Sequence, residues 1–440
     1  MNERQASTIL ATLKHALDET HATWLGRETG FTRRLRTVTP HRLLVTLLTA
    51  FSCQRLRTLA DIHRAFHAIV GRSVEYKPFH NQLRKKSFPK LMEAAFRHLV
   101  KTFLVKALAP VPASALRAFD DIVIHDGSSF GVHAELADVL PGRFGKDNPA
   151  AAAIHVTLSL LREQPVRVSV TSQAKGEPNY LPPARTLRRK LLLADRGYGK
   201  LAYCRAIDEA GGFFVIRLKR TINPNVLSCR MNRCLVPCST GRSLQENLAQ
   251  FRFRNVDLDV EWVRPGEAPL RLRLILRWNP QIHAHWILVT NLPRAEFSPP
   301  AVGALYRLRW QVELLFKELK SHANLHAFRT RQEHIAKGLI WAALCAAVLK
   351  RFLAHAVQRT HDGLDISTQR VAMALALPLP HLMASILAGR RVEDELRALL
   401  TFLARCARRA HPKRDRKTGR LRTGLRPAYV TASGAVRVKV

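Results

Sequence analysis

Five side chains around residue 310 have the types and spacing of a site that handles phosphate groups. They are Tyr306, Arg309, Glu313, Lys317 and Lys320, separated by three, four, four and three residues. Such offsets stack side chains on one face of an α-helix. The glutamate can hold a metal ion, while the arginine can bind two phosphate oxygens and the lysines add positive charge. The same spacing is also typical of a solvated helix face with exchangeable ion pairs.

An apolar stripe beside these residues indicates how the helix is positioned. Ser298 is a suitable N-cap and Pro299 a suitable first-turn residue, so we expect the helix to run from there to about Leu319. The stripe lies next to the polar face and is expected to pack against a sheet. Its members are Leu305, Leu308, Val312, Leu315 and Leu319.

Two aspartates follow short apolar segments that are typical of strands. Asp126 comes after residues 122–124, and Asp195 comes directly after residues 191–194. We therefore expect both carboxylates at the C-terminal ends of strands, the edge where sheets of this kind commonly bind ligands. His125 precedes the first aspartate and should face the opposite side of the sheet, which favours a structural role. Asp120 and Asp121 are interpreted as residues at the entry to that strand.

The segments around the aspartates predict a mixed α/β layer. Three strands, a basic helical segment, a strand, a helix and a strand are expected in that order. Beyond the first strand, the ranges are 152–161 and 166–171 for a hairpin, 182–190 for the basic segment, 191–194, 201–209 and 213–218. Residues 219–297 read as a β-rich insertion, and a second long helix is expected at 335–357.

Residues 1–110 are predicted to be helical and to bind DNA. Thr58 can cap a helix that Gly71 ends, and Pro78 can open a second helix, so residues 58–86 form a plausible helix-turn-helix. An ordinary basic helical bundle fits the same pattern. The side chains that a recognition helix would direct to base edges are His80, Asn81, Gln82, Arg84, Lys85 and Lys86.

The charge of the chain indicates a polyanionic partner. Among 440 residues, 71 Lys and Arg outweigh 33 Asp and Glu and leave a formal charge of +38. Such an excess repels itself unless a polyanion neutralises it, so we expect nucleic acid. No run of about 18 uninterrupted apolar residues is present, and the longest candidate, 339–349, reads as a buried helix rather than a membrane span.

The N-terminus and the cysteines predict a cytoplasmic protein associated with the nucleoid. Residues 1–20 lack the apolar segment of a secretory signal, and seven scattered cysteines suit reduced thiols. Cys229, Cys234 and Cys238 cluster and could hold zinc, but their spacing is not a paired C-x-x-C and no fourth ligand stands out. Metal binding by these three cysteines stays open.

Read together, these segments resemble the IS-four family of bacterial DDE transposases. Its signature of Tyr, two residues, Arg, three residues, Glu, six residues and Lys is met by Tyr306, Arg309, Glu313 and Lys320. Two further marks of the family are met by Asp126-Gly127-Ser128 and Asp195-Arg196-Gly197-Tyr198. The resemblance covers about residues 119–357, and the helical signature is its specific part.

The resemblance implies an α/β fold with an RNase H-like catalytic core, a mixed sheet flanked by helices. The expected domains are a helical DNA-binding domain at 1–110, the catalytic domain at 119–357 with the β-rich insertion at 219–297, and a helical, basic C-terminal region at 358–440. The basic segment 405–422 is expected to be solvated.

The implied catalytic and metal-binding residues are Asp126, Asp195 and Glu313. An all-carboxylate set fits Mg²⁺ or Mn²⁺ rather than zinc, and two ions per site suit phosphoryl transfer. By resemblance, Tyr306, Arg309 and Lys320 contact terminal phosphates and Lys317 assists. Weaker candidates are Ser128 and Arg196 beside the metals and, for a flipped base near the cleaved end, Trp262, Trp278 or Trp286. A turn-stabilising hydroxyl, a solvated arginine and core tryptophans are the alternatives.

The resemblance implies an enzyme that cleaves transposon ends and joins the freed 3′-OH to target DNA. Two ends require two active sites, so we expect a homodimer in a synaptic complex with DNA. Two alternatives stay open from the residues alone. One is a non-catalytic DNA-binding protein or repressor, and the other is a metal-dependent nuclease without strand transfer.

Overall fold

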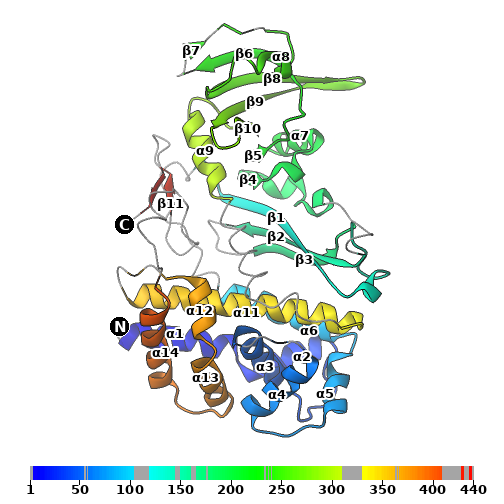
Figure 1. Cartoon of the computed structure of the whole chain (residues 1–440), viewed down its shortest axis with the longest axis vertical. Helices are drawn as coiled ribbons and strands as arrows, with labels where there is room; N and C mark the ends of the chain where they lie inside the picture. The colour runs from blue at the N-terminus through cyan, green and yellow to red at the C-terminus, as the bar shows by residue number, and fades with distance from the viewer. Residues whose placement is uncertain are drawn as a thin grey trace.

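The computed structural model places a ten-stranded sheet above a layer of helices (Figure 1). It describes residues 3–440 apart from 54–55, 57, 104–117, 144–148, 160–164, 175–176, 232–233, 236, 239, 310–329, 362–363, 365, 409–427, 431–435 and 439–440. Most of the predicted basic tail and the hairpin turn at 162–164 therefore lie outside the described residues.

The N-terminal part of the chain is helical as predicted. Thr58 and Asp61 form the capping box of one helix, which Gly71 ends with a φ of 64°. The next helix begins at Tyr76, so the prediction that Pro78 opens it was wrong by two residues; a proline is tolerated within the first turn. The helices are α1 (Glu3–Ala16), α2 (Glu19–Glu28), α3 (Pro40–Cys53), α4 (Leu59–Val70), α5 (Tyr76–Leu83) and α6 (Phe88–Phe103).

The end of α5 changes the expected recognition helix. Because α5 stops at Leu83, Arg84, Lys85 and Lys86 lie between helices rather than on a second helix. The Lys85 ammonium donates to the carbonyl oxygen of Phe31 at 2.8 Å, which holds it against the bundle.

The sheet confirms the predicted order of strands and the helix at 201–209 in a mixed α/β arrangement, but the basic segment 182–190 contains only a short 3-10 turn at Ala184–Leu187. Its order is β3-β2-β1-β4-β5-β10-β9-β8-β6-β7. The strands are β1 (Asp121–Gly131), β2 (Ala151–Ser159), β3 (Pro165–Ser172), β4 (Lys190–Ala194), β5 (Phe213–Arg217), β6 (Asn225–Met231), β7 (Cys234–Leu235), β8 (Val256–Arg264), β9 (Glu267–Asn279) and β10 (Ala284–Thr290). A separate pair is formed by β11 (Ala428–Val430) and β12 (Val436–Val438).

The sheet contains both antiparallel and parallel strand pairs. β1, β2 and β3 are antiparallel, whereas β4 and β5 run parallel to β1. β10 then pairs with β5 antiparallel, so the strands of residues 219–297 continue the same sheet. The prediction that Asp126 ends its strand was wrong, because β1 continues to Gly131 while it pairs with β2.

Helices cover both faces of the sheet. On one face lie α7 (Leu201–Glu209) and α8 (Leu244–Asn247), and short 3-10 turns occur at η3 (Ala134–Leu136), η4 (Glu177–Tyr180), η5 (Ala184–Leu187) and η6 (Arg196–Tyr198). On the other side are α9 (Pro299–Arg307), α11 (Glu333–Thr360), α12 (Thr368–Ala374), α13 (Pro378–Leu387) and α14 (Glu393–Cys406).

The long helix α11 packs between helices from the N-terminal and C-terminal parts of the chain. It packs against α6, α3 and α14 (Figure 1). At Gly338 any added Cβ would lie 2.2 Å from the Phe88 ring, so glycine permits the close approach of α11 to α6. Within the described residues, this helix has the length and apolarity of a membrane span. Its most apolar stretch of 18 residues is 94% buried inside the protein. It therefore serves as a core helix.

Helix α9 is shorter than predicted. Ser298 caps it through the Ala301 N–H, as expected, but the helix ends at Arg307 rather than near Leu319. The backbone then tightens into a three-residue turn, in which the Arg309 N–H donates to the Tyr306 carbonyl at 3.1 Å. Residues 310–319 lie outside the described part of the chain.

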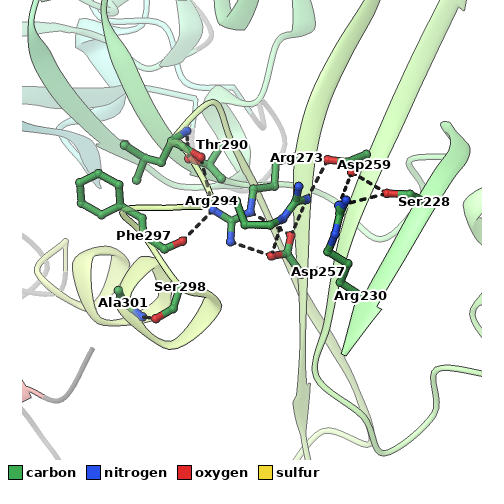
Figure 2. Close-up of polar contacts among 11 residues, drawn as sticks. Ser228, Arg230, Asp257, Asp259, Arg273, Thr290, Arg294, Phe297, Ser298 and Ala301 are labelled. Atoms are coloured by element: carbon green, nitrogen blue, oxygen red, sulfur yellow. Dashed lines mark hydrogen bonds and ion pairs between the residues drawn. The ribbon is translucent and has the colours of Figure 1, made fainter. Parts of the chain in front are cut away.

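A buried ion network fixes the start of α9 to the sheet (Figure 2). Arg273 on β9 binds both carboxylate oxygens of Asp257 on β8 at 2.7 and 2.8 Å, and these side chains are only 6% and 5% exposed. The same guanidinium donates to the Phe297 carbonyl at 2.8 Å, directly before α9. Arg294 adds bonds to Asp257 and Asp259. Burial alone would raise the pKa of Asp257, but its arginine partners hold that pKa below the ordinary value.

We predict that Arg273→Met lowers the free energy of unfolding by about 3 kcal/mol, because it leaves a buried carboxylate with one partner fewer. The matched control is Arg271→Met on the same strand, since Arg271 pairs with Glu261 while 75% exposed. That change should cost less than about 1 kcal/mol. Urea unfolding measures both, and equal losses would show that the buried pair does not stabilise this part of the fold.

Candidate active site

Strand register places the two aspartates side by side. β1 and β4 are parallel, and the last pair in their register joins His125 to Ala194. Asp126 is the next residue of β1, and Asp195 directly follows the end of β4. Neighbouring strands lie about 4.8 Å apart, so the two carboxylates start from adjacent backbone positions.

Both aspartates lie on the face of the sheet that α9 covers. Ile124 and Leu193 are buried in the core cluster on that face, together with residues of α9. Because side chains alternate along a strand, Asp126 and Asp195, each two residues further on, face the same side. Both are half-buried. The sheet thus presents two carboxylates toward one helix.

The neighbouring polar residues have structural contacts. His125 is buried on the opposite face, where its Nδ1 lies 2.8 Å from Thr157 Oγ1 and its ring meets the edge of Tyr198. This agrees with the predicted structural role. At the start of the strand, Asp120 is partly exposed and pairs with Arg189 at 3.3 Å.

Helix α9 and the turn that follows it each supply a partner to one aspartate. The Tyr306 hydroxyl donates to Asp195 Oδ1 at 3.0 Å, and Arg309 Nη1 donates to Asp126 Oδ2 at 3.2 Å. The Gly127 N–H donates to the other oxygen of Asp126 at 2.9 Å. The Arg309 guanidinium also lies over the Tyr306 ring, 5.4 Å from its centroid. Two segments more than a hundred residues apart therefore converge on the carboxylate pair.

Electrostatics keep the Tyr306 phenol protonated. Burial raises its pKa, Arg309 opposes that effect, and the nearby Asp195 carboxylate raises the pKa further. At neutral pH the hydroxyl is therefore a donor. It can hydrogen-bond to a carboxylate or to a phosphate oxygen, but it cannot serve as a base.

Of five further predicted site residues, the structure describes two, Ser128 and Arg196. Glu313, Lys317 and Lys320 lie outside the described residues. Ser128 is half-buried two residues beyond Asp126 on the same face of β1. Arg196 is exposed and lines a neighbouring cleft. The structure thus brings Asp126, Asp195, Tyr306 and Arg309 together.

A cationic cleft of about 370 Å³ opens where β4 and β5 end, and its lining includes Arg196, the residue after Asp195. The parallel register of β4 and β5 ends with Ala194 opposite Ile216, which puts Arg217 next to Asp195. Sequence reasoning missed Arg217, Lys219 and Arg220, although a run of cations directly after a strand parallel to β4 was the available signal. The cleft is lined by Arg196, Arg217, Leu218, Lys219, Arg220, His285 and Ile287.

The three candidate tryptophans differ in their relation to the carboxylate pair. Trp286 on β10 is half-buried on the same face of the sheet, two residues before the core residue Leu288. The Arg217 guanidinium lies 5.0 Å from its ring, and its indole N–H has no hydrogen-bond partner among the described residues. Trp262 packs against the core of the opposite face, and alternation along β9 directs Trp278 there too.

The chemistry of the donor set fits a hard divalent cation. Asp126 and Asp195 offer carboxylate oxygens from adjacent positions, which Mg²⁺ and Mn²⁺ prefer. Within the described residues, no group of three or more His, Cys, Asp or Glu side chains gathers into a metal site. That finding includes Cys229, Cys234 and Cys238, which do not form a zinc ligand set.

Comparisons with known proteins agree with this geometry. The family described as "Transposase DDE domain" matches residues 117–349, just over half of the chain. The transposase for insertion sequence element IS231E of Bacillus thuringiensis subsp. finitimus is 22% identical over 378 residues, which is 74% of this chain and 76% of that protein. The transposase for IS1151 of Clostridium perfringens is 22% identical over 294 residues, which is 55% and 60%.

A shorter and stronger match covers only a part of its relative. The transposase for insertion sequence element IS421 of Escherichia coli is 49% identical over 65 residues, so this chain spans 18% of that protein's length and matches with 15% of its own. The family match, the two long alignments and the converging aspartates, tyrosine and arginine lead to one assignment. The chain belongs to the DDE transposases of insertion sequences.

Proposed function

We propose that the chain cleaves the ends of its insertion sequence and joins the freed 3′-OH to target DNA. One observation carries the proposal: Asp126 and Asp195 stand in adjacent register and each is bonded by a residue of the family signature, Arg309 and Tyr306. Neither a repressor nor an architectural DNA-binding protein needs two carboxylates on adjacent strands beside a cationic cleft.

The catalytic core is proposed to be RNase H-like. Support comes from the antiparallel strands β1 to β3, followed by β4 and β5 parallel to β1, with helices on both faces. The proposed domains remain 1–110 for DNA binding, 119–357 for catalysis with the insertion 219–297, and 358–440 as the C-terminal region. The cellular location that follows is the cytoplasm, at the nucleoid.

In this proposal, Asp126, Asp195 and Glu313 hold two Mg²⁺ or Mn²⁺ ions. When bound, the ions activate a hydroxyl nucleophile and stabilise the leaving oxygen. Tyr306 and Arg309 fix the orientation of the carboxylates through the bonds they already make. A guanidinium carries five N–H donors, so Arg309 can also bind a DNA phosphate, whereas the single O–H of Tyr306 would have to leave Asp195 to do so. Lys317 and Lys320 add charge for the same phosphates.

The proposed partners are transposon-end DNA and target DNA. A formal charge of +38 favours both, and the cleft at the ends of β4 and β5 gathers four cations where a DNA strand can pass. Two DNA ends need two active sites, so a homodimer in a synaptic complex is proposed. A nuclease without strand transfer is the second candidate, since the same carboxylates support cleavage.

We predict that the purified protein, incubated with Mg²⁺ and DNA carrying the element's ends, yields joined products. Asp126→Asn and Asp195→Asn should each lower joining at least about a hundredfold, because they remove an anionic oxygen ligand. Gel analysis of labelled ends measures cleavage and joining separately.

The matched control for these variants is Asp120→Asn, an acidic residue at the other end of the same strand segment that forms only a partly exposed ion pair. It should leave both steps within about twofold of wild type. Cleaved but unjoined products would support the nuclease, and neither product would support a DNA-binding protein. Full activity of Asp126→Asn would overturn the assigned site.

We predict that Arg309→Lys lowers cleavage about tenfold and weakens binding to the ends, because a lysine cannot bind two oxygens with a planar fork. The control is Arg307→Lys, which keeps the same charge at an exposed position two residues earlier. It should behave as wild type. Equal effects of the two changes would mean that only overall charge matters in this segment.

We predict that Trp286 receives an unstacked base near the cleaved end. Trp286→Ala should lower cleavage about tenfold and abolish the fluorescence rise of 2-aminopurine placed at that end, because stacking on the indole helps offset the cost of unstacking. Trp262→Ala, on the opposite face, should retain the rise. If both variants lose the signal equally, the effect is structural and not base binding.

A further inference from the structure

Phe253 has a backbone conformation that large side chains rarely adopt. Its φ is 66°, in the left-handed region, and its side chain is 64% exposed. Burial therefore gives little to offset the unfavourable conformation. Residues held in this way occur preferentially where a ligand or a reaction uses them, which makes the surroundings of Phe253 informative.

Hydrogen bonds anchor the turn that carries Phe253 to the hairpin of β9 and β10. His285 Nε2 lies 3.1 Å from the carbonyl oxygen of Phe251 and 3.0 Å from that of Arg254. The backbone N–H of Trp278 donates to Asn255 Oδ1 at 3.0 Å. Burial lowers the pKa of His285, so the neutral imidazole is favoured and can donate to these carbonyls through Nε2.

An aromatic and cationic group surrounds the exposed ring. The Trp278 ring meets Phe253 edge-on with centroids 4.9 Å apart, and the Arg252 guanidinium lies 4.8 Å from the Phe253 centroid. Trp278 in turn contacts the His285 ring at 5.1 Å. Arg252 and Arg254 are both exposed. The group therefore combines a flat apolar surface with two positive charges.

This aromatic group adjoins the cationic cleft at the ends of β4 and β5. His285 belongs to both, since it lines the cleft and bonds the turn that holds Phe253. The described lining contains cations but no carboxylate. Arg217 at the other side of the cleft is the strand neighbour of Asp195. The cleft lies mainly on the sheet face opposite the carboxylate side chains, since Leu218 and Ile287 belong to the core of that face, so its cations adjoin the exposed ring.

We propose that Phe253, supported by Trp278 and Arg252, forms a stacking site for an unpaired base of a DNA strand whose phosphates lie in this cleft. Base stacking on an aromatic ring beside cations that contact phosphates is the chemistry by which proteins bind single-stranded DNA. The site is distinct from Trp286, which lies on the other face of the sheet. The inference rests on the proposed function for the origin of the unpaired strand.

The test compares Phe253→Gly with Phe253→Tyr in the full chain, without divalent metal. Glycine adopts a φ of 66° freely, so that variant removes the ring without straining the fold, and tyrosine keeps a stacking ring. Fluorescence anisotropy measures binding to a single-stranded oligonucleotide of about 20 nucleotides and to its duplex. Phe253→Gly should weaken single-strand binding about tenfold and duplex binding less than about twofold, while Phe253→Tyr should match wild type.

Val263→Ala is the matched control, because Val263 is an apolar residue on β8, the strand that follows the Phe253 turn, and is 61% exposed. It should leave both affinities unchanged. Unchanged single-strand binding by Phe253→Gly, or an equal loss on both DNAs, would overturn the stacking site. Joining of transposon ends is assayed separately. If wild type joins ends but Phe253→Gly leaves single-strand binding unchanged, only this inference is refuted. If wild type joins no ends but Phe253→Gly weakens single-strand binding, only the proposed reaction is refuted.

Discussion

The parallel pairing of β1 with β4 is the constraint on which the site depends. Asp126 and Asp195 meet because His125 and Ala194 are register partners. A shift of one residue would turn either aspartate to the opposite face of the sheet, away from α9. Buried residues on both strands prevent such a shift, since Ile124 and Leu193 would lose their place in the core. The hydrophobic pattern therefore fixes the chemistry.

A second constraint comes from β8 and β9 of the same sheet. Tyr306 and Arg309 reach the aspartates only if α9 starts at the right place, and the Arg273 guanidinium ties that start to Asp257 (Figure 2). The strands between Asp195 and α9 are thus part of the support of the site. Arg273 of these strands is neutralised by a buried aspartate, whereas Arg217 lines the cleft.

Much of this arrangement could be predicted from the sequence. Asp195, the helix at residues 201–209 and the capping role of Ser298 follow local rules, and the spacing of Tyr306 and Arg309 indicated their shared role. The position of Asp126 within β1 was missed because the pairing with β2 beyond it leaves no local signal. Arg217 and Phe253 were missed for a related reason, since register and backbone φ depend on contacts distant in sequence.

The packing of α11 has a consequence for how the protein is made. Residues 333–360 complete the core of the N-terminal helices, so helices synthesised first remain without their main partner until most of the chain has left the ribosome. At about 5 to 20 residues per second, that delay lasts on the order of tens of seconds. A prematurely terminated product lacks this partner and exposes an apolar surface. Such fragments are expected to be substrates for proteolysis.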